Sequence, residues 1–122
     1  MVEDIKRRLL GHTITGFDIT PDRYQIEFRL LNEKPVRCRT EGDCCSRSWI
    51  ESIDDPAALL GVVQDVEEID MPDLGQLATP FCEHPDVVQY YGLKITTDKG
   101  RAVIDYRNDS NGYYGGEIVL AN

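Results

Sequence analysis

Apolar and polar residues alternate along much of the chain, which is the pattern of strands with one buried face. The alternation is clearest over residues 24–30 and returns over residues 36–40, where Cys38 is expected to face inward. One side of an earlier strand is expected to consist of Thr13, Thr15, Phe17 and Ile19. Because Pro21-Asp22 has the composition of a turn, the first 40 residues predict a hairpin followed by a third strand.

The second half of the chain repeats this pattern. Residues 87–97 and 101–106 flank the turn Asp98-Lys99-Gly100 and predict a second hairpin, and residues 117–120 predict a last strand. A further strand is expected over residues 62–69, where β-branched residues recur between acids.

Helical spacing occurs in short segments. Residues 2–10 place apolar side chains three to four positions apart, with acids early and bases late, as the helix dipole favours. A second helix is expected around the apolar stripe of Trp49, Ile50 and Ile53. An Asp-Pro pair before residues 57–60 has the composition of a helix start, so a third short helix is expected there.

These elements define the expected fold. Residues 1–122 are expected to form a single α+β domain, with a mainly antiparallel sheet of two hairpins and extra strands, an N-terminal helix and short central helices. Residues 71–85 contain three prolines and a glycine and are expected to form a long surface loop, a type of segment that is often functional. A composition of 41% hydrophobic and 29% charged residues is that of a folded globular domain.

The formal charge of −9 is concentrated in the middle of the chain. Residues 41–86 contain twelve acids and one base, Arg47, whereas the flanking residues hold ten acids and twelve bases. Such a field repels nucleic-acid phosphates and attracts a basic protein surface, so we expect a basic protein partner and no direct nucleic-acid binding. The simpler interpretation is that these carboxylates only keep a small domain soluble.

The cellular location follows from what the chain lacks. No apolar run approaches the roughly 18 residues that span a bilayer, and the N-terminal residues lack the continuous apolar stretch of an export signal. We therefore expect a cytoplasmic protein without membrane insertion, whose four cysteines stay reduced. No cofactor is expected, and the sequence does not specify an oligomeric state.

The adjacent pair Cys44-Cys45 allows several chemistries. Metal binding would recruit ligands at a distance, because the side chains of adjacent cysteines diverge, and the zinc alternative is the set Cys38, Cys44, Cys82 and His84. A cysteine nucleophile with a histidine base is a second alternative, although acidic surroundings raise the pKa of a thiol. A disulfide to another cysteine is a third, and simple packing of the pair is the interpretation we favour.

The run Asn111-Gly112-Tyr113-Tyr114-Gly115-Gly116 is the second unusual feature. Asn-Gly favours positive φ angles and Gly-Gly permits close backbone approach, so the two tyrosines are expected to diverge at a turn, with one ring exposed for binding. A hairpin corner with aromatic packing is the alternative. The two motifs are expected to form one binding surface, with the single tryptophan as an apolar anchor. The expected members of this surface are Asp43, Cys44, Cys45, Ser46, Trp49, Asn111, Tyr113 and Tyr114.

The two motifs together resemble a family of small proteins of unknown function from bacteriophages and bacteria, marked by a central Gly-Asp-Cys-Cys-Ser-x-Ser-Trp and a late Asn-Gly-Tyr-Tyr-Gly-Gly. The matching residues are 42–46, Ser48 and Trp49, then 111–116, and the resemblance extends over most of the chain from Gly11 onward. The resemblance implies a viral or mobile-element accessory protein in which the two motifs are neighbours in space, and it brings no established activity.

We therefore expect a protein-binding module rather than an enzyme. In this interpretation the acidic middle region binds a basic protein partner, for example a host nucleic-acid-binding protein for which carboxylates imitate phosphates. A cysteine-dependent enzyme or zinc-binding domain that uses Cys44 or Cys45 is the first alternative. A structural or assembly subunit that associates through an apolar patch is the second.

Overall fold

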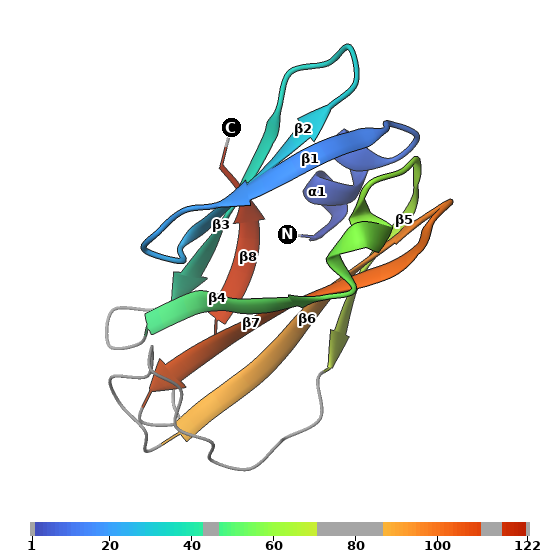
Figure 1. Cartoon of the computed structure of the whole chain (residues 1–122). Helices are drawn as coiled ribbons and strands as arrows, with labels where there is room; N and C mark the ends of the chain where they lie inside the picture. The colour runs from blue at the N-terminus through green and yellow to red at the C-terminus, as the bar shows by residue number, and fades with distance from the viewer. Residues whose placement is uncertain (1, 43–46, 71–86, 111–115, 122) are drawn as a thin grey trace.

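The computed structural model describes residues 2–42, 47–70, 87–110 and 116–121 (Figure 1). The chain begins with helix α1 (Val2–Leu9) and continues with strands β1 (Ile14–Ile19), β2 (Gln25–Leu30), β3 (Val36–Gly42) and β4 (Arg47–Asp54). A 3-10 turn, η1 (Pro56–Leu59), leads to β5 (Val63–Asp70), β6 (Val87–Thr97), β7 (Gly100–Ser110) and β8 (Gly116–Leu120).

The strands form two four-stranded antiparallel sheets, in the orders β1-β2-β3-β8 and β4-β7-β6-β5. The expected class, a mainly antiparallel β structure with an N-terminal helix, is confirmed, and the two expected hairpins are β1-β2 and β6-β7. The strands divide between two sheets because the chain changes sheet twice, from β3 to β4 and from β7 to β8 (Figure 1).

One apolar core fills the space between the sheets. The first sheet contributes side chains such as Ile26, Phe28 and Cys38, all fully buried as the alternation predicts. The fully buried side chains of the second sheet include Leu93, Ile95, Ile104 and Tyr106. Helix α1 packs against β5 and β8, the edge strands of the two sheets, and buries its apolar face in the same core.

Three of the four edge strands contain a β-bulge, which changes the spacing of their inward-facing residues. A bulge adds one residue to a strand, so two inward-facing residues are three positions apart instead of two. The buried or half-buried pairs with this spacing are Ile14 and Phe17 in β1, Ile50 and Ile53 in β4, and Val63 and Val66 in β5. A spacing of three is also a helical spacing, so bulged strands imitate helices in the sequence.

Two expectations from the sequence are wrong because of these bulges. The stripe of Trp49, Ile50 and Ile53 belongs to strand β4 and not to a helix, because the bulge sets the spacing of the two isoleucines. Thr15 does not share the side of Phe17, because it is the extra residue of the β1 bulge and is exposed. The helix expected after the Asp-Pro pair is the single 3-10 turn η1.

Of the remaining expected elements, two strands lie within the described residues and one loop lies outside them. The strands expected over residues 62–69 and 117–120 are present as β5 and β8. The loop expected over residues 71–85 lies outside the described residues. Within the described ranges, no helix is long and apolar enough to cross a membrane.

Candidate functional site

The two sequence motifs fall in the two connections that pass from one sheet to the other. The Cys-Cys motif occupies residues 43–46, between β3 and β4, and the Asn-Gly-Tyr-Tyr motif occupies residues 111–115, between β7 and β8. Both ranges lie outside the described residues, and they contain every member of the expected binding surface except Trp49.

The described residues that flank these connections pair with one another. Gly42 at the end of β3 pairs with Gly116 at the start of β8, and Arg47 at the start of β4 pairs with Asp109 of β7. Neighbouring strands lie about 5 Å apart, so both connections start and end at the same end of the molecule (Figure 1). Direct contact between the two motifs stays a prediction.

A series of hydrogen-bonded polar residues lies next to these flanking residues in β3, β4 and β7. The Thr40 hydroxyl donates a hydrogen bond to the Ser48 carbonyl at 3.1 Å, and the Ser48 hydroxyl donates to the Glu41 carbonyl at 3.0 Å. Asn108 Nδ2 donates to Ser48 Oγ at 2.8 Å. Asn108 is fully buried, and its Oδ1 has no hydrogen-bond partner among the described residues. These bonds fix β3, β4 and β7 to one another at the end that carries the motifs.

Trp49 is fully buried, as expected for an anchor, but it lies on the face of β4 opposite the core residue Ile50. Its indole Nε1 donates a hydrogen bond to Glu51 Oε2 at 2.8 Å. The guanidinium carbon of Arg47 lies 5.8 Å from the centre of the Trp49 ring, within the range of a cation–π contact. Trp49 therefore anchors a polar layer on the outer face of the second sheet.

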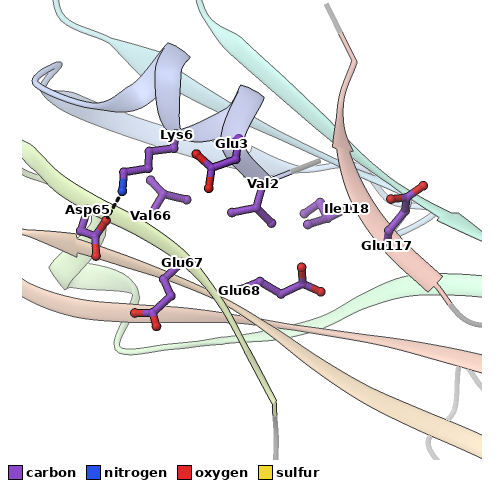
Figure 2. A pocket seen from close by; sticks show the side chains of 9 residues that line it. All are labelled: Val2, Glu3, Lys6, Asp65, Val66, Glu67, Glu68, Glu117 and Ile118. Carbon is purple, nitrogen blue, oxygen red and sulfur yellow. Dashed lines mark ion pairs between the residues drawn. The ribbon is translucent and has the colours of Figure 1, made fainter.

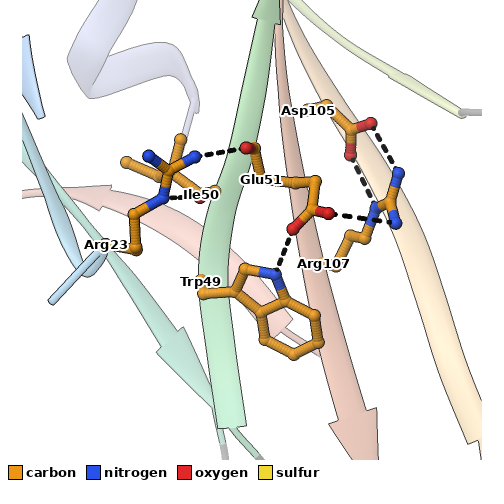
Figure 3. A network of polar contacts seen from close by, with 6 residues as sticks. All are labelled: Arg23, Trp49, Ile50, Glu51, Asp105 and Arg107. Atoms are coloured by element: carbon orange, nitrogen blue, oxygen red, sulfur yellow. Dashed lines mark hydrogen bonds and ion pairs between the residues drawn. The ribbon is translucent and has the colours of Figure 1, made fainter. Parts of the chain in front are cut away.

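Arg107 is the centre of this layer (Figure 3). Its guanidinium donates two hydrogen bonds to the Asp105 carboxylate, at 3.2 and 3.1 Å, and lies 3.6 Å from the carboxylate of Glu51. The guanidinium carbon also lies 4.8 Å from the centre of the Tyr90 ring. Burial opposes the charge of Arg107, but the hydrogen bonds and charge of Asp105, together with the charge of Glu51, outweigh it and raise the pKa of the guanidinium.

Arg23 connects this layer to the first sheet. It lies in the turn between β1 and β2 in the left-handed region, with φ of 68°. Its Nε donates to the Ile50 carbonyl at 2.8 Å and its NH2 group donates to the Glu51 carbonyl, while the Ile50 N–H donates to the Arg23 carbonyl at 2.8 Å (Figure 3). The Arg23 side chain therefore holds the bulge of β4, where the ladder between β4 and β7 is interrupted.

An acidic groove of about 540 Å³ opens between α1, β5 and β8 (Figure 2). Its charged lining consists of Glu3, Lys6, Asp65, Glu67, Glu68 and Glu117. Val2, Val66 and Ile118 form its apolar part. Five carboxylates thus face one ammonium group in a space of the size that binds small ligands or short peptide segments.

Two of the five carboxylates are paired within the chain. Lys6 Nζ lies 2.9 Å from Asp65 Oδ1, and Lys94 Nζ lies 3.0 Å from Glu67 Oε2. The hydrogen bond and charge of Asp65 raise the pKa of Lys6, and the hydrogen bond from Lys6 lowers the pKa of Asp65. The groove therefore already binds one ammonium group, which belongs to α1.

Three carboxylates, those of Glu3, Glu68 and Glu117, make no ion pair with any residue that the structure describes. All three line the groove, from α1, β5 and β8 respectively, and Figure 2 shows the Glu117 carboxylate beyond Ile118, directed away from Glu3 and Glu68. The Tyr106 hydroxyl donates a hydrogen bond to Glu68 Oε1 at 3.2 Å. Burial, followed by the charge of Glu68, raises the pKa of Tyr106, so its hydroxyl stays a donor at neutral pH.

The sequence predicts the acidic region but not this groove. Asp65, Glu67 and Glu68 belong to the acidic middle region, whereas Glu3 and Glu117 come from the two ends of the chain. No local pattern joins these residues, because only the packing of α1 onto two sheet edges brings them together.

A second hollow of about 610 Å³ lies beside the motif flanks, and Gly42 and Arg47 are among its lining residues. Its charged groups are engaged within the chain. Arg39 forms an ion pair with Glu41 at 2.5 Å, and Arg47 Nε donates to the Tyr24 hydroxyl at 3.0 Å. This hollow therefore offers less uncompensated charge than the acidic groove.

Cys38 is the one member of the zinc alternative within the described residues. Its side chain is fully buried among apolar neighbours, and burial raises the pKa of its thiol to about 12. Cys44, Cys82 and His84 lie outside the described residues, so the geometry of the set is not defined. Over the described residues, no three of the histidine, cysteine and acidic side chains are grouped to hold a metal ion.

Comparison with known proteins places the chain in a family. The model of a domain of unknown function, DUF7448, matches residues 7–120, which is nearly the whole chain, and the chain belongs to this family. No curated protein and no solved structure shows significant similarity to it.

Proposed function

We propose that this member of the DUF7448 family is a small protein-binding module whose acidic groove receives a basic segment of a partner protein. The observation that carries the proposal is the set of three carboxylates without an ion pair, Glu3, Glu68 and Glu117, around one groove. The acidic region that the sequence predicts as a binding surface contributes part of this lining.

The electrostatics of the groove favour a cationic ligand. A single exposed ion pair contributes only about 0.2–1 kcal/mol, so three new pairs together supply about 1–3 kcal/mol. The field of five carboxylates also accelerates the encounter with a basic surface. The ion pair between Lys6 and Asp65 shows how an ammonium group is held at one end of the groove.

The partner in this proposal is a host nucleic-acid-binding protein, and the chain acts as an accessory protein of a phage or mobile element. Such a partner presents lysine and arginine side chains for phosphates, and carboxylates at the groove would occupy them instead. The net charge of −9 and the resemblance carried by the two motifs support this version.

Calorimetric titration with octalysine tests the proposal. The affinity is expected to fall at least tenfold when salt rises from about 20 mM to about 500 mM, because screening shortens the range of the field. In the triple variant Glu3→Gln, Glu68→Gln, Glu117→Gln, the affinity at low salt is expected to fall about tenfold or more.

A matched control separates the groove from the overall charge of the chain. The variant Glu33→Gln, Asp54→Asn, Asp55→Asn removes three exposed acids outside the groove and leaves every ion pair described above intact. Its affinity for octalysine is expected to stay within about twofold of the wild-type value. An equal loss of affinity in both triple variants would show that the groove is not the binding site.

A further inference from the structure

The acidic groove runs along the edge of a sheet and not over its face. Strand β5 contributes four consecutive lining residues, Asp65 to Glu68, and β8 contributes the consecutive residues Glu117 and Ile118. Neighbouring residues of a strand point to opposite faces, so a groove over one face would be lined by alternate residues. The groove therefore presents the backbone edges of β5 and β8 to its occupant.

Among the described residues, the outer edge of β5 makes backbone hydrogen bonds only at its start. β5 is the outermost strand of its sheet and pairs only with β6. At its start, the Val63 N–H donates to the His12 carbonyl and the Val63 carbonyl accepts from the Gly11 N–H, each at 2.9 Å. From residue 65 to residue 69, no backbone hydrogen bond joins this outer edge to any described segment. Such an edge offers unpaired N–H and carbonyl groups to another strand.

We infer, on the basis of the proposed function, that the basic segment of the partner binds as an extended strand added to the edge of β5. A strand along residues 65–70 spans about 20 Å and carries alternate side chains toward the space between the sheets. Lysine or arginine at these positions would meet Glu68 and Glu3, and small apolar residues at the intervening positions would face outward. Backbone hydrogen bonds hold the segment, and the carboxylates that line the groove select its basic residues.

Ordered backbone pairing distinguishes this mode from charge attraction alone. The probe is a ten-residue peptide of alternating lysine and valine, with two derivatives that are N-methylated either at every valine or at every lysine. In a strand, the N–H groups of alternate residues point to the same edge, so each derivative blocks one edge and keeps all charges. For a segment that binds in one direction with its lysines directed into the groove, only one of these edges faces β5.

Titration calorimetry and amide hydrogen exchange of residues 65–69 provide the readout. The parent peptide is expected to bind and to slow, at least tenfold, the exchange of those amides among them that point to the outer edge of β5. One N-methylated derivative is expected to lose affinity at least tenfold, and the other to stay within about threefold of the parent. Equal affinity of all three peptides, with unchanged exchange in β5, would overturn strand addition and leave the proposed function intact. Absence of binding by all three peptides and by octalysine would overturn both.

Discussion

Removal of the Arg107 side chain is predicted to destabilise the fold strongly. In the variant Arg107→Met, two carboxylates that are only 12% and 15% exposed, those of Asp105 and Glu51, lose the guanidinium that lies 3.1 and 3.6 Å from them. At an effective dielectric constant of about 20, each attraction over such a distance amounts to about 5 kcal/mol before the change in solvation is counted. Because a buried charge without its partner costs about 3–5 kcal/mol, we expect a loss of about 4 kcal/mol in the free energy of unfolding.

Urea denaturation at pH 7 measures this loss, with Trp49 fluorescence and circular dichroism as parallel probes. Trp49 is the single tryptophan and is fully buried, so its emission reports unfolding directly. With a slope of about 2 kcal/mol per molar urea, the midpoint is expected to fall by about 2 M. The added substitution Asp105→Asn is expected to restore about 1–2 kcal/mol, because it removes one of the two unpaired charges.

Arg101 provides the matched control for this prediction, because it lies on the same strand and is exposed. The variant Arg101→Met is expected to change the free energy of unfolding by less than about 0.5 kcal/mol. A loss below about 1 kcal/mol for Arg107→Met, or no recovery on addition of Asp105→Asn, would refute the role assigned to the buried ion pairs.

Three further predictions concern stability. The pKa of the Cys38 thiol is about 12 in the folded protein, against 9.0 for an ordinary thiol, so the unfolded chain releases its proton first and the free energy of unfolding falls by up to about 1.4 kcal/mol per pH unit above about pH 9. Urea titrations from about pH 8 to about pH 10.5 should show this fall reduced in Cys38→Val, and an identical fall in both proteins would contradict it. Arg23→Ala is expected to lose about 1–3 kcal/mol, because two carbonyls of β4 lose their donor, and Arg23→Lys should recover little of it; full recovery with lysine would argue against the two-pronged hydrogen bonding. Tyr106→Phe is expected to cost about 1 kcal/mol in the same assay through loss of the hydrogen bond to Glu68, and a neutral or stabilising effect would exclude that contribution.

The sequence predicts the strands well where the alternation is unbroken and less well where a bulge interrupts it. Strand β2, in which Ile26, Phe28 and Leu30 face the core, has no bulge and matches the expectation. Strand β4 carries a bulge between Ile50 and Ser52, which gives its inward-facing residues a helical spacing, so the sequence pattern predicts a helix there. The position of a bulge depends on the partner strand and on contacts such as those of Arg23, which a periodicity within one segment does not contain.

The candidate site, like the bulged strands, can be predicted only in part from the sequence. The acidic character of the middle region follows from counting charges, and the contribution of Glu68 to the groove agrees with it. Glu3 and Glu117 are 114 positions apart in the chain and line the same groove only because α1 packs against both β5 and β8. Long-range packing of this kind leaves no signal in a single sequence.

Mapping of amide chemical shifts during titration with octalysine would locate the basic segment on the protein and so test its binding in the groove between α1, β5 and β8. The largest shifts are expected at residues 65–68 and 117–118, which line the groove. Largest shifts around Arg47 and Ser48, beside the second hollow, or shifts spread evenly over the surface, would contradict it.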